Sequence, residues 1–128
     1  MIAVDTNVLV RVLVDDPGEP RQVAAARAGV ARAKEVYVSQ VVQVETVWVL
    51  EAAHGLPKPD VLTVLEHLRG NAAFHLQQRS QFEAALQEFR DGNADFSDYL
   101  VLAESRAQKA RLLTFDKRLL KAPGTQAP

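Results

Sequence analysis

Cysteine is absent from the 128-residue sequence, which excludes disulfides and metal sites held by thiolates. An apolar core must therefore hold the fold together. No apolar run approaches the roughly 20 residues that a membrane-spanning helix needs. Neither the P-loop nor the glycine-rich dinucleotide fingerprint occurs, so phosphate-binding loops of those kinds are excluded. Neither sign of charge dominates, with 15 Lys and Arg against 16 Asp and Glu, so any site for a polyanion has to come from local clustering.

What is present is the composition of a globular protein, with 48% apolar and 24% charged residues. The length suits one domain, in which folding buries about two-thirds of the surface of the unfolded chain. We expect a domain over residues 1–122 and a frayed tail over residues 123–128. The apolar start is interrupted by Asp5 and follows no basic segment, which is unlike a secretory signal, so we expect a cytoplasmic protein.

Short apolar runs alternate with helical segments, a pattern that favours parallel strands joined by crossover helices. We expect strands at residues 2–4, 36–38, 72–76 and 111–115. We expect helices around residues 6–14, 21–34, 40–53, 61–68, 82–89 and 95–109. The Val-rich segment 40–53 has strand propensity, but a strand of that length would be long for a small domain, so we interpret it as a helix. Trp48 and the five Phe are expected in the core.

Two junctions share one layout, in which an apolar strand is followed by an Asp and then by a helix. These are Val4-Asp5-Thr6 and Phe115-Asp116-Lys117. In an open parallel sheet, both Asp side chains would lie at the carboxyl edge of the strands, where ligands bind in such folds. The alternative is that each Asp only caps the helix that follows it, since Asp is a preferred cap residue.

Glu45 and Asp98 are two further candidate acids. If segment 40–53 is helical, the residues three and four positions from Glu45 are apolar, and a carboxylate on that face must be paired, protonated or bound to a cation. The structural alternative is a salt bridge, or a helix rotated so that Glu45 reaches the rim. Asp95 and Asp98 have the spacing of a capping box, and the helix dipole favours an ionised Asp98 that suits a metal.

The four candidate acids are spread over the whole chain, so only the fold can bring them together. They are Asp5, Glu45, Asp98 and Asp116. Carboxylates gathered in one place raise one another's pKa unless a cation neutralises them. Oxygen ligands without Cys or a His cluster select a hard ion, Mg²⁺ or Mn²⁺. A carboxylate-held ion of this kind is the usual apparatus for phosphoryl chemistry.

With these motifs the chain resembles the PIN-domain ribonucleases of the VapC toxin type, over essentially its whole length. The resemblance rests on four segments in this order: Asp5-Thr6-Asn7-Val8-Leu9, Val44-Glu45-Thr46, Ala94-Asp95-Phe96-Ser97-Asp98 and Thr114-Phe115-Asp116. It implies an α/β three-layer sandwich with a central parallel sheet of four to five short strands flanked by helices. The family often ends with a further short strand, and residues 122–128 show no pattern for one.

The resemblance also implies a reaction and roles for six polar residues. The principal Mg²⁺ ligands would be Asp5 and Asp98, the catalytic pocket would be completed by Glu45 and Asp116, and polar support would come from Asn7 and Thr114. The implied reaction is endonucleolytic cleavage of single-stranded or looped RNA by metal-activated water. Toxins of this type usually form homodimers and are silenced by a cognate antitoxin, whose carboxyl-terminal segment occupies the active-site groove.

Residues 106–121 are rich in cations and contain a single acid, Asp116. The cations that we predict as RNA-backbone contacts are Arg106, Lys109, Arg111, Lys117 and Arg118. A solvated helix face is the alternative interpretation of this run. Arg11 stands alone on an apolar helix, and we expect it to pair with a carboxylate rather than to reach a phosphate.

Two other classes of function are compatible with parts of the pattern. A phosphatase would use Asp5 as a nucleophile and form an aspartyl-phosphate. Haloacid-dehalogenase-like enzymes of this kind carry a second Asp two residues later, where this chain has Asn7. A non-catalytic dimeric module that binds RNA or protein would use the acids only as helix caps.

Overall fold

The computed structural model describes all 128 residues, and the chain divides into two units, Met1–Gln77 and Gln78–Pro128. Both units combine helices with parallel strands, so the α/β class expected from the sequence is confirmed. Each helix is too short or too polar to cross a lipid bilayer.

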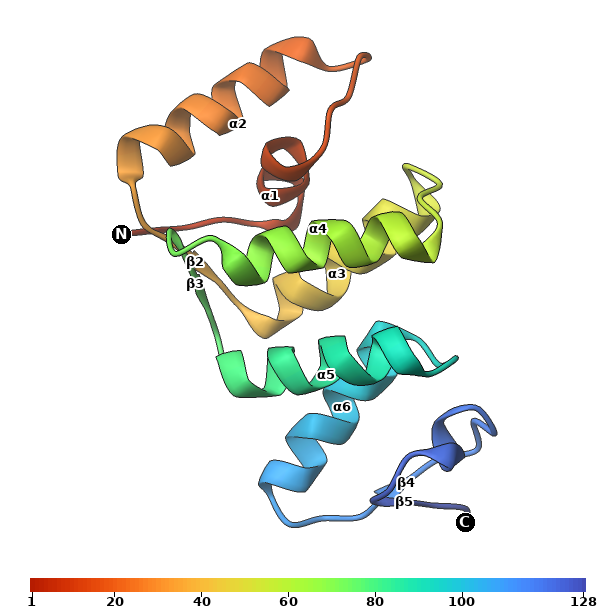
Figure 1. Cartoon of the computed structure of the whole chain (residues 1–128). Helices are drawn as coiled ribbons and strands as arrows, with labels where there is room; N and C mark the ends of the chain where they lie inside the picture. The colour runs from red at the N-terminus through yellow and green to blue at the C-terminus, as the bar shows by residue number, and fades with distance from the viewer. The chain divides into compact units, whose positions relative to one another are not determined.

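Unit 1 alternates strands and helices. In chain order its elements are β1 (Ile2–Ala3), α1 (Thr6–Leu13), α2 (Pro20–Ala33), β2 (Val36–Val38), α3 (Gln40–Ala52), α4 (Lys58–Gly70) and β3 (Phe74–Leu76). The strands are parallel in the order β1-β2-β3, with Ile2 opposite Val36 and Val36 opposite Phe74. Helix α1 packs against both α2 and α3 (Figure 1). Because all three strands are parallel, their carboxyl ends meet at one edge of the sheet.

Helix α3 begins at this edge of the sheet, and side-chain hydrogen bonds fix its first turn. Ser39 caps α3, since its hydroxyl oxygen accepts the backbone N–H of Val42 at 3.3 Å. Gln43, which is fully buried, donates from its side-chain amide to the backbone oxygen of Gln77 at 3.0 Å. This bond ties α3 to the carboxyl end of β3. The helical interpretation of the Val-rich segment is therefore confirmed.

The core of unit 1 is aliphatic. Its fully buried side chains include Leu9, Val10, Val36, Val38, Leu50, Val61, Leu65 and Leu68. These residues come from α1, α3 and α4 and from β2 itself, so the short strands and the helices are stabilised by packing against one another. Trp48 is not part of this core, because 54% of it is exposed, and the expectation that it would be buried is wrong.

Unit 2 combines two long helices with a small parallel sheet. Its elements are α5 (Arg79–Asp91), α6 (Phe96–Ala107), β4 (Leu112–Leu113), the 3-10 helix η1 (Leu119–Lys121) and β5 (Thr125–Gln126). Phe96 lies edge-on to two rings of α5, with centroids 5.7 Å from Phe82 and 5.9 Å from Phe89. These three rings are buried as predicted, whereas Phe115 is 87% exposed and its predicted core position is wrong.

The expected central sheet of four to five strands is wrong. The structure has a three-stranded sheet in unit 1 and a separate pair, β4 with β5, in unit 2. Leu112 of β4 lies opposite Thr125 of β5, so the terminal segment contains a strand where none was expected. Strands of two residues carry no alternation that a sequence pattern can reveal. The end is held by Arg111, which donates to the backbone oxygen of Thr125 at 2.9 Å.

Candidate active site

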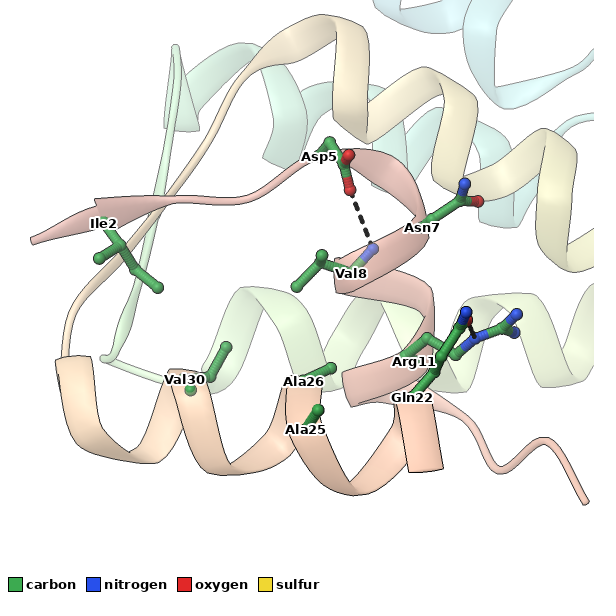
Figure 2. Close-up of a pocket in the computed structure, with 10 residues that line it drawn as sticks. Ile2, Asp5, Asn7, Val8, Arg11, Gln22, Ala25, Ala26 and Val30 are labelled. Carbon is green, nitrogen blue, oxygen red and sulfur yellow. Dashed lines mark hydrogen bonds between the residues drawn. The ribbon is translucent and has the colours of Figure 1, made fainter. Parts of the chain in front are cut away.

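Asp5 lies at the carboxyl end of β1 and caps α1. One carboxylate oxygen, Oδ1, accepts the backbone N–H of Val8 at 3.0 Å (Figure 2). The side chain is exposed, and this single hydrogen bond leaves the second oxygen of the carboxylate open to solvent. Capping and ligand binding are therefore compatible for Asp5, because each role uses a different oxygen.

Glu45 lies on the exposed face of α3. Its carboxylate oxygen Oε1 accepts a hydrogen bond from the hydroxyl of Thr6 at 3.3 Å, which brings it beside the start of α1. Val41 and Trp48 flank it on the same helix face and are 67% and 54% exposed. The expectation of an apolar, buried surrounding for Glu45 is wrong. Of its apolar neighbours three and four positions away, Val41 and Trp48 face solvent, whereas Val42 is buried and Val49 is half-buried.

A groove of about 480 Å³ runs between α1 and α2 and includes Asp5 and Asn7 in its lining. Apolar side chains from both helices, among them Val8 and Val30, make most of its wall (Figure 2). Arg11 also lines the groove. The structure thus places two of the predicted polar residues at an apolar groove.

Arg11 is fixed by two hydrogen bonds. Its guanidinium donates to Asp16 at 2.7 Å, and its Nε donates to the side-chain oxygen of Gln22 at 3.1 Å. The expected pairing of Arg11 with a carboxylate is confirmed. Because Gln22 belongs to α2, the bond also holds the two walls of the groove together.

Asp98 lies in the first turn of α6 and forms the predicted capping box with Asp95. Its carboxylate accepts the backbone N–H of Asp95 at 3.3 Å. Burial raises the pKa of Asp98 above its usual value, and the charges of Asp95 and Asp116 raise it further. The Asp95 N–H and the guanidinium of Arg118 act in the opposite direction. Three carboxylates of unit 2 are thus close enough to repel one another.

Asp116 follows β4 and is paired with Arg118. Its carboxylate accepts the Arg118 backbone N–H at 2.8 Å and the guanidinium at 3.2 Å. These bonds, the side-chain one first, lower the pKa of Asp116. The hydroxyl of Thr114 accepts the backbone N–H of Asp116 at 3.0 Å. The helix expected directly after Asp116 is wrong, because a turn comes first and only the short η1 follows.

The predicted RNA-contacting cations fall into two groups. Arg106 pairs with Glu88 at 2.5 Å and also donates to the backbone oxygen of Pro123, while Arg111 is bonded to β5. These two arginines hold unit 2 together. Lys109 and Lys117 are exposed at its surface, and Arg118 is half exposed in its pair with Asp116.

A model of the PIN domain family matches residues 2–124, nearly the whole chain. The chain belongs to the PIN domain family. PIN domains are generally nucleases, so the fold is of a nuclease type, and they typically use divalent metals. A comparison with curated proteins gives no match.

The donor set of this PIN domain suits a divalent metal. Within neither unit are three or more Asp, Glu or His side chains arranged as a ready metal-binding group. The acids are nevertheless all oxygen donors, the ligands that Mg²⁺ and Mn²⁺ prefer. Burial is the largest cause of the raised pKa of Asp98, and the charges of Asp95 and Asp116 add a smaller repulsion that a bound cation would relieve. The donor chemistry therefore suits such an ion, while no group of three donors is assembled in the structure.

Two contacts of the PIN domain were missed by sequence reasoning. The bond from Thr6 to Glu45 joins residues 39 positions apart, and no local pattern indicates it. The pairing of Arg118 with Asp116 had a signal, because the two residues are only two positions apart in a turn. Arg118 was expected to contact RNA or to belong to a solvated helix face, and neither interpretation of the charged run considered its pairing with Asp116.

Proposed function

We propose that this PIN domain is an endoribonuclease that depends on Mg²⁺ or Mn²⁺ and cleaves RNA phosphodiester bonds. The observation that supports it best is the match to the PIN domain family over residues 2–124, because PIN domains are generally nucleases. The carboxylates of Asp95 and Asp116 also lie near enough to Asp98 to raise its pKa, in addition to the larger effect of burial. Asp95 and Asp98 stabilise α6 as its capping box, but the charge of Asp116 near them adds repulsion that a cation would remove. Perturbed carboxyl groups of this kind concentrate at functional sites.

In the proposed reaction, Asp5 and Asp98 hold the metal, with Glu45 and Asp116 completing the acidic pocket. When bound, a divalent cation supplies an activated water and offsets the charge that develops on the phosphate. Asp5 offers the carboxylate oxygen that its capping bond leaves open. Thr114 fixes the backbone at Asp116, so that this acid is presented from a defined turn.

The RNA strand carries one negative charge per phosphate, and the exposed cations of unit 2 are suited to bind it. Lys109 and Lys117 have solvent-facing ammonium groups. Arg118 already neutralises Asp116 and is half exposed, so that a phosphate can share its guanidinium. Arg106 and Arg111 contribute less in this proposal, because both are engaged within unit 2.

We further propose that the protein acts inside the cell as the toxin of a toxin–antitoxin pair and forms a homodimer. The resemblance to VapC-type toxins supports both. The groove between α1 and α2 supports the antitoxin in particular, because an apolar segment seated there would lie against Asp5 and Asn7. Such a segment would hinder access to one of the proposed metal ligands.

The direct test is cleavage of a single-stranded RNA by the purified protein in Mg²⁺. We expect cutting that EDTA abolishes and that Asp98→Asn reduces by more than the roughly 10–100-fold typical of losing an outer-shell partner. The matched control is Asp60→Asn, which removes the same charge from the first turn of α4. A clean Asp98→Asn preparation that cuts as fast as the unmodified protein would contradict the proposal.

A second candidate is a non-catalytic module that binds RNA or protein. The observation in its favour is that Asp5 and Asp95 both cap helices and Asp116 is occupied by Arg118. Titration calorimetry with Mn²⁺ separates the two candidates. Binding at micromolar to millimolar metal favours the nuclease, and heat of binding from RNA alone, without metal binding, favours the module.

A further inference from the structure

The hydroxyl of Thr6 makes an unusual contact for a threonine in a helix. Threonine hydroxyls in helices often bond the backbone carbonyl four residues earlier, as Thr63 does with Pro59 in α4 at 3.1 Å. Thr6 is the first residue of α1, so the corresponding carbonyl belongs to β1 rather than to the helix. Its hydroxyl donates instead to Oε1 of Glu45 in α3, at 3.3 Å. The bond therefore serves a carboxylate and not the helix that carries Thr6.

Helix α1 does not need this hydroxyl in order to begin. Its cap is Asp5, whose carboxylate accepts the backbone N–H of Val8 at 3.0 Å. The cap fixes the backbone at Thr6, and a β-branched side chain on a helical backbone has few χ1 rotamers. The hydroxyl of Thr6 is thus a donor whose direction is largely set before it meets a partner.

Glu45 depends on Thr6 for its orientation. The Thr6 hydroxyl is the one hydrogen-bond donor that contacts the Glu45 carboxylate. A glutamate side chain has several rotatable bonds, and without a fixed donor it spreads over many rotamers. The bond engages Oε1 and leaves Oε2 without a hydrogen-bond partner.

The contact also sets the place of the Glu45 carboxylate. Thr6 directly follows Asp5, so its hydroxyl draws this carboxylate of α3 to the Asp5 end of α1. Both helices belong to unit 1 and pack on one another. The length of 3.3 Å exceeds the about 2.7–2.8 Å that is usual for an O–H···O bond. Hydrogen bonds of catalytic groups are often long in the free protein and tighten in the complex with substrate.

We propose that Thr6 is a positioning residue, whose hydroxyl holds the Glu45 carboxylate at the Asp5 end of α1 and leaves Oε2 free to act. This inference rests on the proposed nuclease function and adds a residue that the function does not include. In this role Thr6 acts through Glu45 rather than by touching RNA. Loss of the hydroxyl should therefore lower kcat and leave KM for RNA unchanged.

The first test measures the orientation of Glu45 in the metal-free protein. Three-bond couplings of its side chain, measured by NMR, report the populations of its χ1 rotamers. We expect one dominant rotamer in the unmodified protein and in Thr6→Ser, which keeps the hydroxyl. We expect averaging among rotamers in Thr6→Val, which keeps the shape of the side chain and removes the hydroxyl. The matched control is Thr63→Val, which removes a hydroxyl that bonds a carbonyl of its own helix.

The second test is cleavage of a single-stranded RNA in Mg²⁺. Thr6→Val is expected to lower kcat about ten-fold, as is typical of losing a group that orients another, with KM and the melting temperature unchanged. Thr6→Ser should retain most of the rate. In a Glu45→Ala background, Thr6→Val should cost nothing further, because the hydroxyl then has no carboxylate to hold.

The outcomes separate this inference from the function on which it rests. If RNA is cut and Thr6→Val leaves kcat and the rotamers of Glu45 unchanged, the positioning role is overturned and the nuclease stands. If Thr6→Ser loses as much as Thr6→Val, or if the loss persists in the Glu45→Ala background, Thr6 acts through packing, which also overturns the inference. If the unmodified protein cuts no RNA with Mg²⁺ or Mn²⁺, both proposals are overturned.

Discussion

Two effects act in opposite directions on the carboxylate of Asp98. Its carboxylate caps the start of α6 by accepting the Asp95 N–H, yet burial and the neighbouring charges of Asp95 and Asp116 raise its pKa. A metal would bind the ionised carboxylate of Asp98. In the metal-free protein, burial and the neighbouring charges destabilise this ionised form relative to the protonated one. Such conflicts between stability and function are typical of active sites.

Asp98→Asn is therefore expected to stabilise the metal-free protein slightly at pH 7, by less than about 1 kcal/mol, because solvent screens the charge of a partly exposed side chain. The Asn side-chain oxygen still accepts the Asp95 N–H, while the repulsive charge is gone. The pKa of Asp98 is higher in the folded protein than its usual value of 3.8. Ionisation of this carboxyl therefore lowers the free energy of unfolding as the pH rises from 3.8 through the folded-state pKa. The advantage of Asn should shrink as pH falls and the unmodified carboxyl becomes protonated.

Urea unfolding at pH 7 and near pH 4 measures both parts of this prediction. The control is Asp60→Asn, whose acid lies in the first turn of α4. If the Asp98→Asn protein is less stable at pH 7, the stabilisation that the carboxylate gives as a helix cap is larger than the repulsion it suffers from Asp95 and Asp116, which contradicts the prediction.

Arg118→Ala is expected to raise the pKa of both Asp116 and Asp98. The guanidinium is the main cause that lowers the pKa of Asp116, and its charge also lowers that of Asp98. Carboxyl carbon shifts followed by NMR titration would report each acid separately. Arg118→Lys keeps the charge and should leave Asp98 nearly unchanged, and equal pKa values in all three proteins would refute the pairing.

At the scale of single residues, the sequence predicted roles better than exposures. The cap formed by Asp5 and the capping box of Asp95 and Asp98 follow from local spacing, and the pairing of Arg11 follows from its isolation on an apolar helix. Glu45 was misplaced because α3 has apolar residues on several faces, so its periodicity does not indicate which face is buried. Only the packing of α1 and α4 against α3 decides this.

At the scale of elements, the connection between α5 and α6 is tightly packed. A Cβ added at Gly92 would overlap the hydroxyl of Tyr99, a residue only 3% exposed. That hydroxyl accepts the backbone N–H of Ala94 at 3.2 Å, so the ring cannot move without losing the bond. The turn leading into the capping box of α6 therefore depends on a glycine and a tyrosine that touch.

Gly92→Ala is expected to destabilise the protein by about 2 kcal/mol, within the 1–3 kcal/mol typical of overpacking. The matched control is Gly70→Ala in α4, where nothing lies within 4 Å of the added Cβ and Ala favours the helix. Thermal unfolding of the two variants gives the comparison. Similar melting temperatures for the two variants would mean that the close approach of Gly92 and Tyr99 does not affect the stability of the protein.

The helices of this protein could be predicted because each has a repeated apolar spacing or a cap. In α5, for example, Phe82, Leu86 and Phe89 recur at helical intervals. The strands could not be bounded in the same way. β5 consists of Thr125 and Gln126 alone, and it forms because Arg111 and the parallel partner β4 hold it, neither of which is visible in the terminal sequence.

At the scale of the whole molecule, the family could be inferred from four short acidic segments, and the match to the PIN domain over residues 2–124 confirms it. The arrangement of the sheet could not be inferred. Leu112 and Leu113 have the composition of a central strand, yet they pair with β5 in a separate two-stranded sheet. Pairing partners depend on long-range contacts that composition does not encode.

Metal binding should stabilise the folded protein. An ion at 100 times its dissociation constant adds about 2.7 kcal/mol, which raises the melting temperature by several degrees in a chain of this size. We expect this shift with Mg²⁺ or Mn²⁺ in scanning fluorimetry and its loss in Asp98→Asn. A shift of equal size in both proteins would place the metal elsewhere.

The most direct measurement of the central claim is an anomalous difference map from crystals soaked in Mn²⁺. The claim is that Asp5 and Asp98 share one divalent ion in a PIN-domain nuclease. It predicts a peak within coordination distance, about 2.1 Å, of a carboxylate oxygen of each residue. A well-occupied Mn²⁺ that touches neither acid, or only one of them, would contradict the claim.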